Sequence, residues 1–164
     1  MNILIEGPDG CGKSTFIETL QKEFKNHTVW HLTKTTPDVT EGPSFYRDKK
    51  NCIFDRGILS TYVYSKIFKD TKIPSQRDIK SILNKMDAVV FCLPFSKPLY
   101  LRHFQNLKNT REEEYSNMSD VFDEFTELYL KWFPELKNRW KLDIFERPEE
   151  TTKYIIKNLK ILSS

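Results

Sequence analysis

The chain has 164 residues, enough for one domain with a sizeable core, and 38% of them are hydrophobic. Its formal net charge of +3 is too small for a surface that coats nucleic acid, so we expect small anionic partners bound at a local basic site. No apolar run approaches the length of a membrane span, and the first expected strand begins at the second residue, which predicts a protein without a signal peptide.

The three cysteines, Cys11, Cys52 and Cys92, are odd in number and lie far apart in the sequence. None has the spacing of a metal-binding motif, and two of them lie within apolar strand patterns. Free thiols in a reducing compartment are the simplest interpretation, and we therefore expect a cytoplasmic protein.

The first expected elements are a strand over residues 2–5 and a helix marked by Phe16, Ile17, Leu20 and Phe24. Between them, Gly7–Ser14 matches G-x-x-x-x-G-K-[ST], a phosphate-binding loop (P-loop) in its proper strand–loop–helix setting. The glycines allow a tight turn whose N–H groups point at phosphate oxygens, and the helix N-terminus adds partial positive charge. The residues expected to bind a nucleoside triphosphate are Gly7, Asp9, Gly10, Cys11, Gly12, Lys13, Ser14 and Thr15.

Within this loop, Lys13 is expected to reach the β- and γ-phosphates, and the Ser14 hydroxyl to ligate Mg²⁺. A strand over 28–32 follows, and then a polar, Pro-containing stretch, 33–50, which we predict to be a substrate loop. A third strand, 51–54, ends in Asp55 and Arg56. An aspartate in this place can orient Mg²⁺, and an arginine beside it can clamp a second phosphate. A switch or motor needs no cation aimed at an acceptor, whereas a kinase does.

Two helices are predicted next, one marked by Leu59, Val63 and Ile67 and the other by residues 79–83. The sequence Asn84–Asp87 then spells N-K-x-D, the guanine-reading motif of GTPases. In GTPases this motif follows a strand, but here it precedes the apolar run 88–93, and the D-x-x-G glycine of a switch is missing after Asp55. We interpret the match as a coincidence.

The polar stretch 106–118, which contains Lys108, Arg111 and the acidic run 112–114, is predicted to be an irregular, mobile lid. The best amphipathic helix follows at 121–133, where Ser119 is positioned to cap it and Pro134 would end it. A last strand is expected over 142–145 and a last helix after Pro148. Strands that alternate with helices predict one α/β domain over residues 1–164, a three-layer sandwich with a five-stranded parallel sheet. Ligands should lie at the carboxyl ends of its strands.

The combined pattern resembles the thymidylate kinase family along nearly the whole chain. Residues 6–15 are similar to that family's P-loop, including Asp9 two positions after the first glycine. Residues 55–64 resemble its D-R-Y-x-x-S-x-x-A-Y segment, and Arg102 and Arg111 match the arginines that begin and occupy its lid. The resemblance implies a P-loop nucleoside or nucleotide kinase fold with a lid, which transfers the γ-phosphoryl group of Mg-ATP to a pyrimidine deoxynucleoside monophosphate such as dTMP.

The resemblance also implies roles on the acceptor side. Asp9 would accept a hydrogen bond from the 3′-hydroxyl of the acceptor, and Arg56 would hold its 5′-phosphate. Tyr64 would pack under the sugar and leave no room for a 2′-hydroxyl. Ser60 or Thr61 would face the base.

On the donor side, the resemblance implies that Arg102 stacks on the adenine of ATP. The family's catalytic arginine comes either from the P-loop or from the lid. Because Gly10 occupies the P-loop position, Arg111 should supply it, so the expected catalytic residues are Lys13, Arg56 and Arg111. The resemblance further implies a homodimer.

The chain departs from the family in its substrate loop. The F-P-x-R pattern is absent after the second strand, where Lys34 could substitute as the cation. Phe45 and Arg47 could replace the base-stacking phenylalanine and base-reading arginine, but their spacing is two rather than four. Gly57 replaces the tyrosine of the D-R-Y segment. The preferred base, whether thymine, uracil or a modified pyrimidine, therefore stays open.

Three other functions fit the P-loop but fit the rest of the sequence less well. A deoxynucleoside kinase on the same fold has a hydroxyl acceptor and needs a carboxylate base, but after the second strand the chain offers Thr33 and Lys34. A kinase acting on a modified base within DNA would need an extended basic groove, which the near-neutral charge argues against. A non-catalytic or ATPase interaction protein would not need Asp55 and Arg56 together with Arg111.

Overall fold

The computed structural model describes residues 1–33, 42–69, 72–108 and 112–164. The strands are β1 (Asn2–Glu6), β2 (Thr28–His31), β3 (Cys52–Asp55), β4 (Ala88–Cys92) and β5 (Arg139–Leu142). The helices are α1 (Lys13–Glu23), α3 (Ile58–Ile67), α4 (Gln76–Leu83), α5 (Lys97–Lys108), α6 (Glu112–Trp132) and α7 (Pro148–Ser163), with short 3₁₀ turns η1 (Gly42–Tyr46) and η2 (Phe133–Glu135). Among these described helices, none combines the length and the apolar character that crossing a membrane requires.

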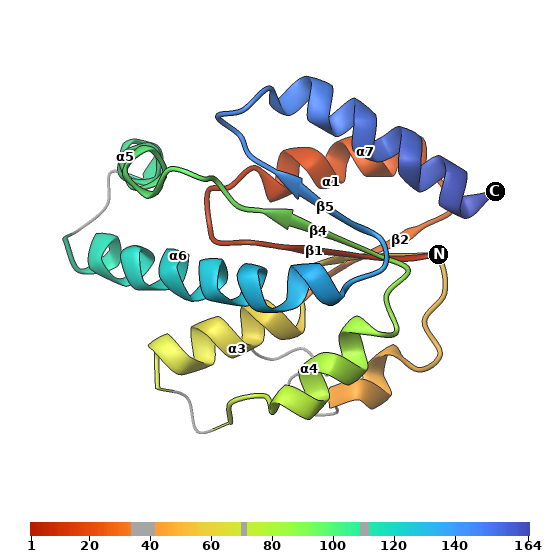
Figure 1. Cartoon of the computed structure of the whole chain (residues 1–164), viewed down its shortest axis with the longest axis horizontal. Helices are drawn as coiled ribbons and strands as arrows, with labels where there is room; N and C mark the ends of the chain where they lie inside the picture. The colour runs from red at the N-terminus through yellow and green to blue at the C-terminus, as the bar shows by residue number, and fades with distance from the viewer. Residues whose placement is uncertain (34–41, 70–71, 109–111) are drawn as a thin grey trace.

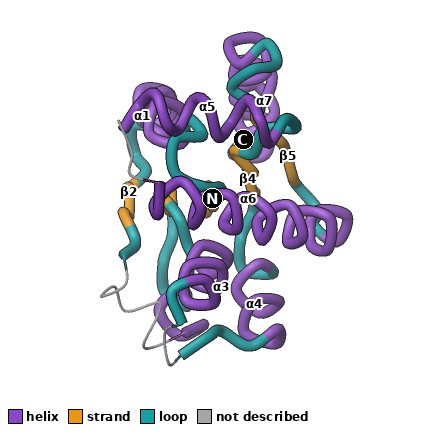
Figure 2. Tube along the Cα trace, turned by 90° about the vertical axis from the view of Figure 1, so that its left-hand side faces the viewer, coloured by secondary structure: helices purple, strands orange, loops and turns teal. Residues whose placement is uncertain are grey.

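The described strands form one parallel sheet of five, as the sequence predicts, and the structure gives their order as β2-β3-β1-β4-β5. Helices α1 and α7 cover one face and α3, α4 and α6 cover the other, so the molecule has three layers (Figure 1). Figure 2 shows β2 and β5 at opposite edges of the sheet. Every residue of β1 and β4 is buried because both strands have neighbours on both sides and helices on both faces.

The carboxyl ends of the strands are brought level by the register. Ile5 of β1 pairs with Asp55 of β3, which in turn pairs with His31 of β2. Glu6 pairs with Phe91 of β4. Helix α5 lies beyond this end of the sheet (Figure 1). The P-loop and the residues that follow β2 and β3 therefore share one edge, as the sequence predicts.

The last strand corrects the sequence prediction. It covers Arg139–Leu142 rather than 142–145. As an edge strand, it leaves its first three positions exposed or partly exposed, so that Arg139 and Lys141 are tolerated within it. The apolar residues after Leu142 belong instead to a turn, in which the Asp143 carboxylate accepts the N–H groups of Phe95 and Phe145.

The secondary structure predicted for the lid segment is also wrong. The irregular stretch 106–118 is largely helical: α5 extends to Lys108, α6 begins at Glu112, and only 109–111 lies outside the described residues. Helix α5 packs through the buried side chains of Tyr100 and Phe104, one turn apart. Ser119 lies inside α6 and does not cap it. The stretch 112–114 lies at the start of α6. Pro134 follows the end of α6, as predicted.

Candidate active site

The P-loop requires glycine at two points of close approach. A Cβ atom on Gly7, whose φ is +150°, would lie 2.1 Å from the carbonyl oxygen of Cys92 at the end of β4. A Cβ atom on Gly12, whose φ is +81°, would lie 2.6 Å from Cγ2 of Ile144. Both the backbone conformation and the neighbours therefore exclude larger residues, and the loop is held against the ends of β4 and β5.

Lys13 begins α1 and is buried beneath the loop. Its ammonium group donates to the carbonyl oxygens of Gly7 at 2.8 Å and Pro8 at 2.6 Å. Burial lowers the pKa of Lys13, and the nearby Arg56 lowers it further. The side chain is thus fixed at the phosphate-binding loop by groups that a phosphate could replace as acceptors.

A pocket of about 600 Å³ opens above the P-loop. Its walls come from the P-loop, the end of β3, helix α5 and the turn after β5. The residues that line it are Asp9, Gly10, Gly12, Lys13, Ser14, Thr15, Asp55, Arg56, His103, Leu107, Ile144 and Phe145. Six of the predicted nucleotide-binding residues are therefore brought together with the Asp55-Arg56 pair in one cavity.

The pocket has the oxygen ligands that a magnesium ion prefers. Ser14 and Asp55, the two predicted ligands, both line it. One oxygen of Asp55 lies 2.7 Å from Nδ1 of His31. No group of three His, Cys, Asp or Glu side chains that could hold a metal occurs among the described residues. The residues present therefore fit a magnesium ion that is shared with nucleotide phosphates.

The acceptor side is built around Arg56, the first residue after β3. Arg56 has a positive φ of 69°, which is uncommon for a residue with a side chain, and its N–H donates to the carbonyl of Ile5 at 2.9 Å. Its guanidinium forms an ion pair with Asp9 of the P-loop. The centre of the guanidinium lies 5.4 Å from the ring centroid of Tyr64. The predicted acceptor residues Asp9, Arg56 and Tyr64 thus form one cluster.

Tyr64 is held rigidly by its neighbours. Its ring stacks on Phe68 at 6.1 Å between centroids and meets the edge of Phe125 at 6.4 Å. Burial raises the pKa of Tyr64 to about 12, so its hydroxyl stays protonated at neutral pH.

The two hydroxyls expected near the base are both engaged. Ser60 is buried and donates its hydroxyl to Glu6, so of the two alternatives, Ser60 or Thr61, it is not the one that faces the base. Thr61 is partly buried, and its hydroxyl donates to the carbonyl of Gly57 at 3.1 Å.

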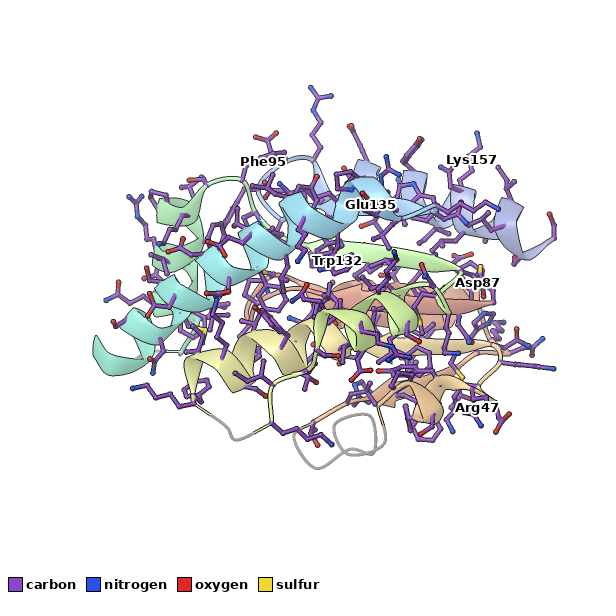
Figure 3. The ribbon with its side chains drawn as sticks, turned by 60° about the horizontal axis from the view of Figure 1, so that its bottom comes forward. Arg47, Asp87, Phe95, Trp132, Glu135 and Lys157 are labelled. Carbon is purple, nitrogen blue, oxygen red and sulfur yellow. The ribbon has the colours of Figure 1, made fainter. Side chains whose placement is uncertain are left out.

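Phe45 and Arg47 are not brought to the pocket, contrary to the prediction. Phe45 is a core residue that meets Trp30, Tyr46 and Phe54 edge to face. Arg47 lies near the amino end of the sheet, toward the same end of the molecule as Asp87 (Figure 3). Two residues after it, the carbonyl of Lys49 accepts a hydrogen bond from the Asn2 side chain at the start of β1. The aromatic and basic residue types fit base recognition, but the packing puts them elsewhere.

The last three predicted residues are Lys34, Arg111 and Arg102. Lys34 and Arg111 belong to the segments that the structure does not describe. Arg102 is exposed on α5 and does not line the pocket, whereas His103 and Leu107 do. The ring of His103 meets Phe145 edge to face at 5.6 Å, so these two side chains from α5 and the turn after β5 close one end of the pocket.

Sequence reasoning missed four residues that support the site, namely Glu6, His31, Tyr100 and His103. The Tyr100 hydroxyl donates to the backbone carbonyl of Asp9 at 2.7 Å and so ties α5 to the P-loop. His31 meets Asp55 only because β2 and β3 are paired in register. The spacing of Tyr100 and Phe104 would have predicted α5, but no local pattern identifies the partners of these four residues.

Comparison with known proteins agrees with this geometry. The model of the KAP family P-loop domain matches residues 1–128. The SPbeta prophage-derived protein YorR of Bacillus subtilis is 32% identical, over 77% of this chain and 78% of its own. The crystal structure of YorR, in complex with phosphorylated GDP, has a TM-score of 0.80 and 24% identity, with 98% of this chain and 96% of that chain covered.

The deoxyadenosine kinase of M. mycoides, solved with the products dCMP and dCDP, has a TM-score of 0.68 and 18% identity. The match covers 99% of this chain and 100% of that one. At this identity the likeness concerns the fold alone. The fold is that of the P-loop nucleoside kinases.

Proposed function

We propose that this chain, which belongs to the KAP family of P-loop domains, is a kinase that phosphorylates a deoxynucleoside monophosphate. It transfers the γ-phosphoryl group of ATP to the 5′-phosphate of the acceptor. Because the sequence resembles the thymidylate kinase family, the pyrimidine deoxynucleotide dTMP is the first acceptor to assay. The homodimer and the preferred base stay predictions from the same resemblance.

The observation that carries the proposal is the position of Arg56. The P-loop provides one phosphate-binding place, at Lys13, and Arg56 provides a second cation on the same pocket. Its left-handed backbone and its contacts with Asp9 and Tyr64 hold the guanidinium at the pocket wall. A planar guanidinium suits bidentate binding of a phosphate, which a nucleoside acceptor would lack.

The proposed chemistry is mainly positioning and neutralisation of charge. The 5′-phosphate of the acceptor is already an anion, so its attack on the γ-phosphate needs no general base. Lys13 and Arg56 would hold the two phosphates in line and stabilise the charge of the transition state. Ser14 and Asp55 would hold Mg²⁺, which when bound neutralises charge on the donor phosphates. Arg111 stays our candidate for a third cation, from the segment outside the described residues.

A second function, the phosphorylation of a deoxynucleoside at its 5′-hydroxyl, is favoured by one observation. The carboxylate of Asp9 lies beside Arg56 in the pocket, and a hydroxyl acceptor needs a carboxylate base. The deoxyadenosine kinase of M. mycoides, whose fold this chain shares, is by name a nucleoside kinase, and one of its structures holds the product dCMP.

The test is a panel of deoxynucleosides and their monophosphates, each assayed with Mg-ATP and the purified protein. The proposal expects the highest kcat/KM with a monophosphate. Faster turnover of any bare deoxynucleoside than of its monophosphate would replace the first function with the second. The three cysteines of the protein are buried free thiols, so the assays should be run under reducing conditions. Free thiols also support our proposal that the enzyme is cytosolic.

A further inference from the structure

A buried carboxylate joins the P-loop strand to helix α3. Glu6 is the last residue of β1 and has no solvent exposure. Its oxygens accept the N–H groups of Leu59 at 3.0 Å and of Ser60 at 3.2 Å, and also the Ser60 hydroxyl. Because the N-cap of α3 is Gly57, the helix has no capping side chain of its own. Glu6 caps the helix instead, from a strand more than 50 positions away in the sequence.

The turn between β3 and α3 is pressed against β1 at this point. A Cβ atom on Gly57 would lie 2.8 Å from Cδ1 of Leu4 and 3.4 Å from Oε1 of Glu6. The preceding residue, Arg56, is bonded through its N–H to the carbonyl of Ile5. The turn is therefore attached to β1 on both sides of Gly57, by the backbone of Ile5 before it and by the side chain of Glu6 after it.

These two attachments hold Arg56 in an unfavourable conformation. A left-handed backbone costs free energy for a residue with a side chain, and it persists only where the surrounding contacts impose it. Loss of the Glu6 attachment would free the first turn of α3 and let Arg56 relax away from Asp9.

The electrostatics agree with an anchoring role. Burial raises the pKa of Glu6 to about 7, while the hydrogen bonds from Ser60 and Leu59 and the charge of Lys13 oppose this rise. A buried carboxylate is costly, and here the positive end of α3 and three donors partly offset that cost.

We infer that Glu6 is a positioning residue that sets the geometry of Arg56 and through it the binding of the acceptor phosphate. The inference rests on the proposed function. It assigns Glu6 no contact with substrate, and it predicts that Glu6 influences one substrate far more than the other.

The test compares Glu6→Gln with Asp143→Asn in steady-state kinetics, with KM measured separately for the acceptor and for ATP. Asp143 is a matched control because it is also a buried carboxylate that accepts backbone N–H groups, but it holds the turn next to Ile144 and Phe145. Glu6→Gln keeps the shape of the side chain but replaces one of its two acceptor oxygens with an NH₂ donor, so one of the groups that now donate to Glu6 loses its acceptor. We expect it to raise the acceptor KM about tenfold and to change the ATP KM less than about twofold. Asp143→Asn should raise the ATP KM more than the acceptor KM.

Ser60→Ala is a second, milder variant that keeps the inference testable if Glu6→Gln does not fold. It removes only the hydrogen bond from the Ser60 hydroxyl to Glu6. It should raise the acceptor KM about threefold with the ATP KM unchanged. If these variants change both KM values equally, or leave the acceptor KM unchanged, the inference about Glu6 is overturned. The proposed function still stands in that case, provided that the wild-type protein phosphorylates a monophosphate. A wild-type protein that phosphorylates no monophosphate would overturn both.

Discussion

Arg56 of the β3–α3 turn and Asp9 of the P-loop form an ion pair that spans 47 positions of the chain. Each side chain is a little more than a quarter exposed. Burial opposes the charge of Arg56, but Asp9 beside it raises the pKa of the guanidinium above its ordinary value. The pair connects the P-loop, expected to hold ATP, with the turn expected to hold the acceptor. Substitutions in the pair therefore test both expectations.

Arg56→Ala is expected to raise the KM for a monophosphate acceptor about a hundredfold, because it removes a charged bidentate donor. Binding of ATP alone, measured by calorimetry, should change only a few fold. A double-mutant cycle with Asp9→Asn should give a coupling of about 1 kcal/mol in the free energy of unfolding, a modest value because both groups are partly solvated. Additive effects in the cycle would contradict the ion pair in solution.

Lys13→Ala should reduce kcat by at least about a hundredfold, since the lysine stabilises charge on the transferred phosphoryl group. The variant should stay folded, because Lys13 lines the pocket and water can enter from there the space that its side chain leaves. Circular dichroism checks the fold. A folded variant with normal turnover would show that the loop does not bind the transferred phosphate.

Gly12→Ala should weaken ATP binding and destabilise the fold, because the added Cβ would lie 2.6 Å from Ile144 at a backbone φ of +81°. The second variant, Gly12→Ala with Ile144→Ala, removes the clash but keeps the backbone strain. We expect it to recover part of the affinity lost by Gly12→Ala, relative to Ile144→Ala alone. No recovery would mean that backbone strain alone, rather than contact with Ile144, requires glycine here.

Tyr64 should select against a 2′-hydroxyl, since its ring is fixed by Phe68 and Phe125 beside Arg56. Tyr64→Ala should narrow the preference for deoxyribose over ribose by about tenfold in kcat/KM. Tyr64→Phe keeps the ring and should retain most of the preference. If Tyr64→Ala leaves the ratio unchanged, Tyr64 is a packing residue only.

Glu6 gives the stability of the protein a defined pH dependence. Because burial raises its pKa from 4.5 to about 7, the folded state holds a proton in that range that the unfolded state releases. The free energy of unfolding should therefore fall as pH rises from about 4.5 to about 7, with a contribution of about 3 kcal/mol from Glu6. Urea unfolding of wild type and Glu6→Gln over this range tests it. Parallel pH profiles for the two proteins would refute the shifted pKa.

The sequence by itself determined the parts of the protein that are local along the chain. The P-loop is one contiguous motif between a strand and a helix, so its residues meet whatever the rest of the fold does. Alternating apolar strands and amphipathic helices likewise predicted the three-layer α/β fold, since each pattern records which face of an element is buried. The same reasoning put β5 three residues too far along the chain. An edge strand exposes charged side chains, so its sequence lacks the continuous apolar run on which the prediction relied.

Only the tertiary structure decided which distant residues meet. Glu6 reaches α3, Asp9 reaches Arg56, and His31 reaches Asp55 because the strand order puts β1 between β3 and β4 and pairs β2 with β3. Hydrophobic periodicity fixes the face of a strand but not its neighbour. The family resemblance put Asp9 and Arg56 at one site, but nothing in the sequence paired Glu6 with α3 or His31 with Asp55. Phe45 is a matching case: an aromatic residue in a polar loop suits base stacking and core packing equally well, and burial against Trp30 and Phe54 decided for the core.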